Sequence, residues 1–416
     1  MKVNDARAAA EAAARSSYGR LVAYLAARSH DLSAAEDALA DAFRSALETW
    51  PRDGVPIKPE AWLLTAAHRK MVDARRHDRV LLAASSTLKL LADEGRNKGE
   101  TPDAFPDERL KLLFVCAHPA IDRAARTPLM LQTVLGLDVA RIAAAFLVAP
   151  AAMAQRLVRA KAKIRDAGID FEVPGLRDLA PRLEAVLEAI YAAFGAGWED
   201  VAGADPRLRN LVAEAIWLAR LVVDLLPGEP EAKGLLALML HCEARRSARR
   251  TGDGAFVPLS DQDTCLWSRP LMVDAERLLM AASVAQRIGR FQLEAAIQSA
   301  HAERARNGKV DWAAIVHLYD GLVALAPGIG AQLGRAAAIA EARGPEQGLA
   351  ALGSIPSEAI ATHQPYWALR AHLLSTLGRA AEARNAYERA IGLSEDQAVR
   401  EFLIERCRSA AALDEK

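Results

Sequence analysis

Hydrophobic residues along the chain recur at intervals of three and four positions, and no stretch alternates between apolar and polar residues for long. Ala and Leu dominate the composition, whereas β-branched residues are sparse. Intervals of three to four place apolar side chains on one face of an α-helix, while a half-buried strand requires a period of two. The pattern therefore predicts an all-α fold.

The helical pattern stops at four places, and these breaks divide the chain. They lie at residues 93–107, 168–181, 227–230 and 251–263. The first break is polar and contains Gly and Pro, which is typical of a linker between domains. We predict a helical domain at residues 1–92, a linker at 93–107, a second domain at 108–167, a helical domain at 168–290 and helical repeats at 291–416.

The first domain contains an amphipathic helix that we predict to start at Ser33. Ser33 and Glu36 have the spacing of a capping box, in which each side chain accepts a hydrogen bond from a backbone N–H at the helix start. The apolar stripe of this helix consists of Leu39, Phe43, Ala46 and Trp50. Its opposite face carries Asp37, Asp41 and Arg44.

A second helix of this domain starts near Pro59 and ends near Val80, and its C-terminal part is basic. Its basic residues are Arg69, Lys70, Arg75, Arg76 and Arg79, opposed only by Asp73 and Asp78, with His68 and His77 beside them. One interpretation is a solvated helix face, which is the usual place for a run of charges. The run alone favours that interpretation.

The second domain contains two consecutive short helices. Asp138 can cap the first helix, residues 147–149 form a turn, and Pro150 opens a second helix that ends near Arg165. One face of the second helix carries Met153, Leu157, Ala160 and Ile164, and the remaining surface carries Gln155, Arg156, Arg159, Lys161 and Lys163. This is the pattern of a DNA-binding helix-turn-helix with a basic recognition helix. A helix hairpin inside an ordinary α-solenoid is an equally good interpretation of the motif alone.

The distribution of charge changes this balance. Lys+Arg and Asp+Glu both number 53, and a net charge of zero argues against a nucleic-acid-binding protein. Residues 1–167, however, hold 26 basic and 20 acidic residues, a net charge of +6, and the remainder is at −6. The basic excess therefore lies in the part that contains the helix-turn-helix pattern.

Several other classes of protein are disfavoured. The four cysteines are far apart without a CxxC pair, so we predict reduced thiols, no metal and no cofactor. The N-terminus lacks the apolar core of a secretory signal, and no apolar run is long enough to span a bilayer, so we expect a cytoplasmic protein without membrane contact. An enzyme is the least favoured class, because no nucleophile–base pair, metal spacing or phosphate loop is present.

Three segments resemble bacterial extracytoplasmic-function sigma factors of the sigma-70 family. Residues 136–165 resemble, without a gap, the family's region 4, which reads the promoter −35 element. Residues 35–46 resemble the region 2 segment that binds the clamp helices of RNA polymerase, and residues 61–76 resemble the part that meets the −10 element. The sequence departs from the family at Arg141, Leu147, Ala152 and Ala154, so the promoter sequence cannot be inferred from relatives. Leu147 occupies a turn position where the family has Gly, which implies another turn shape or a strained one.

The resemblance implies a role for each candidate residue. Asp37, Asp41 and Arg44 would bind polymerase. Trp62, His68, Lys70, Arg75 and Arg76 would hold the melted −10 strand. Gln155, Arg156, Arg159, Lys161 and Lys163 would enter the major groove at −35, with Gln155 and Arg156 as base readers.

The C-terminal part resembles a tetratricopeptide-repeat solenoid. With Trp367 as the fourth position of a 34-residue frame, the small and aromatic positions of that repeat fall on Ala371, Leu374, Gly378, Ala383, Tyr387 and Ala390. Gly344 precedes Gly378 by one repeat length, and Tyr319 precedes Tyr387 by two. About three degenerate repeats are expected between residues 306 and 396. The whole chain thus resembles sigma factors with a C-terminal tetratricopeptide domain.

A further basic run, Arg245–Arg250, follows an apolar segment at residues 235–242 that reads as a buried helix. Its arginines either complement that helix's C-terminal dipole and pair with acidic neighbours, which we favour, or contact the polymerase or the N-terminal domains.

The sequence as a whole predicts an alternative sigma factor whose partners are core RNA polymerase, promoter DNA and a possible protein ligand of the repeats. The C-terminal region would modulate activity, either as an inhibitor or, as we favour, as a required element. The rival interpretations are a tetratricopeptide interaction scaffold and a helix-turn-helix regulator that does not bind polymerase.

Overall fold

A computed structural model describes residues 2–83, 108–134, 136–146, 148–199, 206–356 and 360–412. These residues form helices joined by loops, and the one β-type pairing among them is an isolated bridge between Arg250 and Phe256. The prediction of an all-α fold is confirmed. The predicted linker at 93–107 and Leu147 lie outside the described residues.

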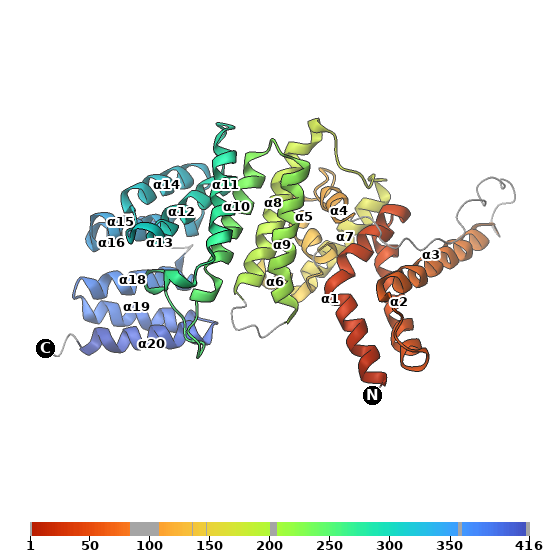
Figure 1. Ribbon diagram of the computed structural model, residues 1–416, viewed down its shortest axis with the longest axis horizontal. Coiled ribbons are helices and arrows are strands. Elements are labelled where there is room, and N and C mark those ends of the chain that lie inside the picture. Colours follow the sequence, from red (N-terminus) through yellow and green to blue (C-terminus); the bar gives the residue numbers. More distant parts are fainter. Residues whose placement is uncertain are drawn as a thin grey trace. The chain divides into compact units, whose positions relative to one another are not determined.

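The chain divides into two compact units, Met1–Leu221 and Val222–Lys416. This division falls inside the segment 168–290 that the sequence suggests as a single domain. The helices of the first unit are α1 (Lys2–Ser29), α2 (Leu32–Asp53), α3 (Pro59–Ala83), α4 (Arg109–Cys116), α5 (Arg123–Thr133), α6 (Val139–Ala145), α7 (Pro150–Asp166), α8 (Leu176–Glu199) and α9 (Pro206–Leu225), the last of which runs across the division (Figure 1).

Helix α2 shows how local sequence sets an element. Its inner face includes the buried Leu39, Ala46 and Trp50, as the predicted stripe requires, although Phe43 of that stripe is only half-buried. The predicted capping box is wrong, because Asp31 is the N-cap and accepts the hydrogen bond from the Ala34 N–H at 3.0 Å. The Asp31 carboxylate satisfies an unpaired N–H group at the helix start. The helix therefore begins at Leu32, one residue before Ser33.

The other predicted helices of this unit form close to their expected bounds. Helix α3 begins at Pro59, and α7 begins at Pro150 with Met153, Leu157, Ala160 and Ile164 buried, as predicted. The Asp138 side chain accepts a hydrogen bond from the Arg141 N–H at 3.0 Å, which confirms Asp138 as a cap for α6. The break predicted at 168–181 is too long, because α8 already begins at Leu176 and contains Pro181 as its sixth residue.

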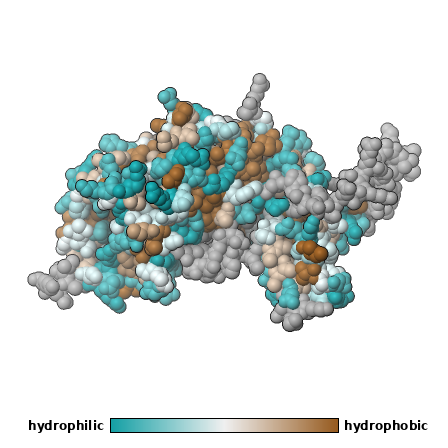
Figure 2. Space-filling model, in the orientation of Figure 1, coloured by the Kyte–Doolittle hydropathy of each residue, from teal (hydrophilic) through white to brown (hydrophobic). Residues whose placement is uncertain are grey.

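The second unit consists of α10 (Pro230–Ala244), the 3-10 turns η1 (Arg246–Ala248), η2 (Leu259–Asp261) and η3 (Thr264–Leu266), then α11 (Arg269–Ser283), α12 (Arg290–Ala302), α13 (Arg304–Asn307), α14 (Trp312–Leu325), α15 (Ile329–Arg343), α16 (Pro345–Gly353), α18 (Gln364–Thr376), α19 (Ala380–Leu393) and α20 (Gln397–Ala412). Most of these helices pack on their neighbours in the sequence, and α18, α19 and α20 lie side by side in Figure 1. Figure 2 shows mainly hydrophilic residues on the visible face of this unit.

Small residues set the close spacing of these helices. A Cβ added at Gly334 in α15 would lie 2.4 Å from the Tyr319 ring of α14, and one at Gly348 in α16 would lie 2.4 Å from the Ala340 Cβ. Gly344 and Gly378, which are 34 positions apart, end α15 and follow α18 with positive φ of 104° and 71°. A positive φ after a helix therefore recurs at the interval that the sequence indicates, at positions that favour Gly.

His301 at the end of α12 is a largely enclosed titratable group. Its ring lies edge-to-face against Trp312, with centroids 5.3 Å apart. Burial, followed by the repulsion of the nearby Arg245 and Arg304 guanidinium groups, lowers the pKa of His301 to about 4. The ring is therefore neutral in the folded protein at physiological pH.

We expect His301 to make this unit sensitive to mild acid. The unfolded chain takes up a proton near pH 6.5 and the folded unit does not, so the stability that a neutral His301 permits is present above about pH 6.5 and is lost as the pH falls toward 4. Thermal unfolding measured at pH 7 and pH 5.5 should show a smaller drop in midpoint for His301→Phe than for the wild type. Equal drops in the two proteins would contradict the assignment, and His317→Phe, whose exposed ring bonds the Ala313 carbonyl, is the matched control.

Candidate nucleic-acid and polymerase interface

The predicted recognition helix α7 presents most of its polar candidates to solvent. Gln155, Arg159 and Lys163 are exposed, and Arg156 is half-buried with its Nη1 donating to the Ala124 carbonyl at 3.4 Å. The buried face of α7 packs on α5 and α6. The helix therefore offers cationic side chains along one accessible face, as contact with phosphates and base edges requires.

Lys161 differs from its neighbours on α7, because it is engaged inside the protein. Its Nζ lies 2.6 Å from Oε2 of Glu36 in α2, and the two side chains are 13% and 16% exposed. Burial raises the pKa of Glu36, and the ammonium of Lys161 opposes that rise. The sequence places Glu36 in a capping box and Lys161 on DNA, whereas the structure joins them.

The predicted polymerase-binding face lies directly beside this pair. Asp37 is exposed, and Asp41 and Arg44 form an ion pair on the same outer face of α2. Surface pairs of this kind contribute little to stability, so their side chains can exchange partners at low cost.

The candidate residues on α3 differ in their exposure to solvent. His68 and Lys70 are exposed, but Trp62 is half-buried and lies edge-to-face against Trp50 with ring centroids 5.5 Å apart. Part of the Trp62 ring thus belongs to the core between α2 and α3. The side chains of Arg75 and Arg76 lie outside the described part of the structure, although α3 continues through both positions.

Sequence reasoning missed Arg109, the first residue of α4. Arg109 is buried, forms an ion pair with Glu214 of α9, and holds its guanidinium 4.4 Å from the centre of the Trp217 ring. Helix α8 packs on both α4 and α5, and Arg123 at the start of α5 lies 3.8 Å from Glu184. The two helices that follow the predicted DNA-binding domain therefore complete its core.

The basic run in the second unit is mostly engaged within that unit. Arg245 donates to Gln298 at 2.5 Å, Arg246 pairs with Glu243 at 2.8 Å, and Arg250 pairs with Asp396. Burial, followed by the repulsion of these neighbours, lowers the pKa of Arg249 to about 10. The geometry favours the structural interpretation, in which this run fixes the loop after α10.

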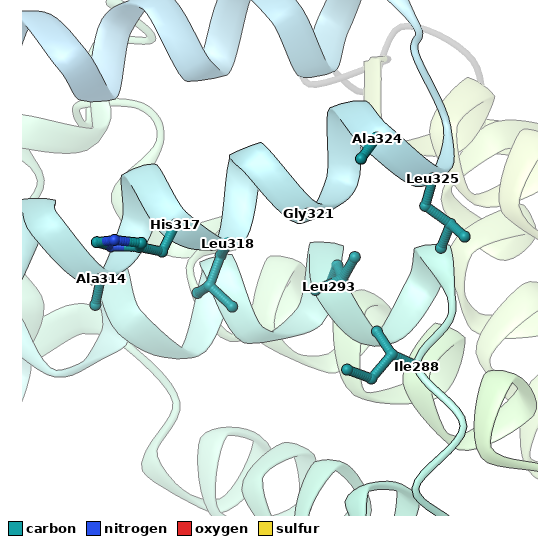
Figure 3. Close-up of a pocket in the computed structure, with 8 residues that line it drawn as sticks. All are labelled: Ile288, Leu293, Ala314, His317, Leu318, Gly321, Ala324 and Leu325. Atoms are coloured by element: carbon teal, nitrogen blue, oxygen red, sulfur yellow. The ribbon is translucent and has the colours of Figure 1, made fainter.

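One apolar groove lies between α12 and α14 in the second unit. It has a volume of about 680 Å³ and is lined by Ile288, Leu293, Ala314, His317, Leu318, Gly321, Ala324 and Leu325. Figure 3 shows His317 toward one end and Leu325 toward the other. Apart from His317, the lining is apolar, so the groove suits apolar contacts.

The described residues contain no group of His, Cys, Asp and Glu side chains placed to hold a metal. The four cysteines are free, and burial raises the pKa of Cys116 to about 12, which makes that thiol unreactive. No helix in the described part is both long and apolar enough to cross a membrane.

Comparison with known proteins places these elements in families. The family profile of sigma-70 region 2 matches residues 14–80, which cover the second half of α1, all of α2 and nearly all of α3. A family of unknown function, DUF6596, matches residues 182–283, from α8 to α11. An uncharacterised protein of Rhizobium meliloti (strain 1021) is 41% identical over 370 residues, which cover 88% of this chain and 87% of that protein. No solved structure matches the chain.

Residues 14–80 thus match a sigma-70 region 2 domain. The chain belongs to one family with the Rhizobium meliloti protein, and their alignment extends well beyond region 2.

The contacts of α4 and α5 lead to a prediction about truncation. A chain that ends at Ala167 loses the cover that α8 gives to α4 and α5, and it loses the partners of Arg109, Glu214 and Trp217. We expect this truncation to lose cooperative unfolding, measured by circular dichroism during heating. A chain that ends at Gly228, after α9, should keep it.

The single variant Glu214→Gln in the full-length protein separates the loss of the Arg109 ion pair from the loss of the cover that α8 provides. It removes the charge that pairs with Arg109 and leaves α8 in place, so it should lower the unfolding midpoint without abolishing the transition. A chain ending at Ala167 that is as stable as the chain ending at Gly228 would refute this account.

Proposed function

We propose that this protein is an alternative sigma factor of the extracytoplasmic-function group. It binds core RNA polymerase through α2, contacts the −10 element through α3 and reads the −35 element through α7. The observation that carries the proposal is the sigma-70 region 2 match to α1–α3 on the same chain as α7, a helix whose accessible face is basic. The chemistry of transcription belongs to the polymerase, and the protein acts in the cytoplasm without a cofactor.

Each candidate residue has a defined part in this proposal. Asp37, Asp41 and Arg44 dock on the polymerase clamp. Trp62, His68, Lys70, Arg75 and Arg76 hold the melted strand, with stacking supplied by the exposed part of the Trp62 ring. Gln155 and Arg156 read bases, while Arg159, Lys161 and Lys163 neutralise phosphates.

The second unit acts in this proposal as a required tetratricopeptide-like element. Its support is the recurrence of tight Gly turns and of close helix packing at Gly334 and Gly348. Its protein ligand would use the apolar groove between α12 and α14, because apolar side chains are what the groove lining can complement. Transcription with the chain ending at Gly228 tests whether the second unit is required or inhibitory. This chain lacks the second unit but keeps the helices that cover α4 and α5.

Transcription with purified core RNA polymerase tests the proposal as a whole. With DNA from upstream of the protein's own gene, Arg156→Ala combined with Arg159→Ala should lower promoter-specific run-off product at least about tenfold, because two good base or phosphate contacts are worth about 1–3 kcal/mol each. Arg277→Ala combined with Arg379→Ala, two exposed arginines of the second unit, is the control of equal charge.

The rival functions give different results in the same experiment. An interaction scaffold or a regulator independent of polymerase would not co-purify with the core enzyme, and its run-off product would not depend on the chain. Undiminished transcription with both α7 arginines removed would show that α7 does not read the promoter.

A further inference from the structure

Helix α11 of the second unit carries large apolar side chains on the face that points to solvent. Its inner face holds the buried Ala275, Leu278 and Ala282, and the helix contacts α10 and α12. Its outer face holds three residues that we call the α11 stripe: Val273, Met280 and Val284, which are 60%, 70% and 80% exposed. A helix that is apolar on opposite faces is typical of one that is covered on both sides.

The α11 stripe is continuous along the helix. Val284 is the C-cap residue and keeps helical backbone angles, with φ −59° and ψ −28°. The members of the stripe are seven and four positions apart, so at 3.6 residues per turn they point in directions within about 20° of Val273. The three side chains therefore form one row.

Exposed apolar residues are concentrated here. In the described part of the chain, six large apolar side chains are at least 60% exposed, and four of them lie between Val273 and Ile288. Single apolar residues scattered over a surface need no explanation, whereas a contiguous apolar patch marks an interaction site. The α11 stripe is therefore a surface that a partner covers.

The charges beside the stripe indicate the partner. Asp274 and Arg277 form an ion pair on one flank, one turn apart, and the Arg277 side chain is 69% exposed. On the other flank, the Glu276 carboxylate accepts a hydrogen bond from Ser299 at 2.6 Å and is thus held within the unit. The accessible flank consequently offers one base and one acid.

A second copy of α11 complements both the apolar row and this flank. In a twofold pair, the same surface patch serves on both copies, so each contact between two different residues occurs twice. When two such helices lie antiparallel with their stripes in contact, each flank faces the same flank of the other copy. Arg277 of each copy then lies beside Asp274 of the other. Because α11 holds two basic and two acidic residues in all, the two helices meet without net repulsion.

We infer that the α11 stripe is a self-association surface: two copies of this chain pack through antiparallel α11 helices, stripe against stripe, with Arg277 of each copy paired to Asp274 of the other. This inference goes beyond the proposed function and does not depend on it, because self-association is measured without polymerase or DNA. Helix α11 has 15 residues, fewer than the roughly 20–30 per partner of a standard interface, so the dimer is reversible.

Sedimentation equilibrium of the full-length protein measures the dimer directly. Between about 1 and 100 µM, the wild type should shift from the mass of one chain toward that of two. Val273→Asp should raise the dissociation constant at least about tenfold, because it buries a carboxylate in an apolar contact. The matched control is Val158→Asp in α7, where the same change is made at a valine that is 66% exposed, and it should leave the constant unchanged.

Charge reversal tests the antiparallel pairing itself. Asp274→Arg leaves only bases on the flank, and Arg277→Asp leaves only acids, so each variant alone should dissociate further than the wild type. An equimolar mixture of the two variants should form a one-to-one dimer at a concentration where each alone is monomeric. Both variants lack the ion pair within the chain, so mixing can restore an attraction only between chains, and a misfolded variant is not rescued by mixing.

Each other result overturns the inference. A wild type that stays monomeric over the whole range shows that two copies do not associate. A dimer that Val273→Asp weakens no more than Val158→Asp uses a different surface. A dimer that depends on Val273 but forms no mixed species from the two charge variants lacks the antiparallel pairing.

The same variants separate this inference from the proposed function. If core RNA polymerase covers the stripe instead, the wild type alone is monomeric and Val273→Asp lowers its retention on immobilised core enzyme relative to Val158→Asp. That result overturns the inference and leaves the proposed function intact. Self-association that follows the expected pattern in a protein that the core enzyme does not retain supports the inference and overturns the proposed function.

Discussion

The structure of the first unit depends on α4, an eight-residue helix of which only Lys111 reaches solvent. Residues 112–116 are all at most 1% exposed, so α4 is almost completely enclosed by its neighbours. Its neighbours supply the cover: α1 on one side, and α5 and α8 on others. A helix this short does not persist by itself in water, so it exists only where several modules meet around it. The region 2 helices, the α7 domain and the beginning of the DUF6596 segment consequently share one core.

This shared core explains why the boundaries suggested by the sequence do not coincide with the compact units. Local patterns predicted the elements well: Pro59 and Pro150 open α3 and α7, Asp138 caps α6, and the buried face of α7 is the predicted one. Each of these follows from residues within four positions of one another. The pairings that join the modules do not. Arg109 meets Glu214 across 105 positions and Glu36 meets Lys161 across 125, and no periodicity along the chain encodes either pairing.

In the candidate site, too, the sequence predicts local features but not contacts between modules. Exposure of Gln155, Arg159 and Lys163 follows directly from the helical period of α7, because the buried stripe leaves them outward. The engagement of Lys161 could not follow from it, since its partner lies on another module. Trp62 is a similar case, because its packing against Trp50 depends on how α2 and α3 cross. Sequence reasoning thus identified which side chains can face outward, but not which of them a neighbouring module covers.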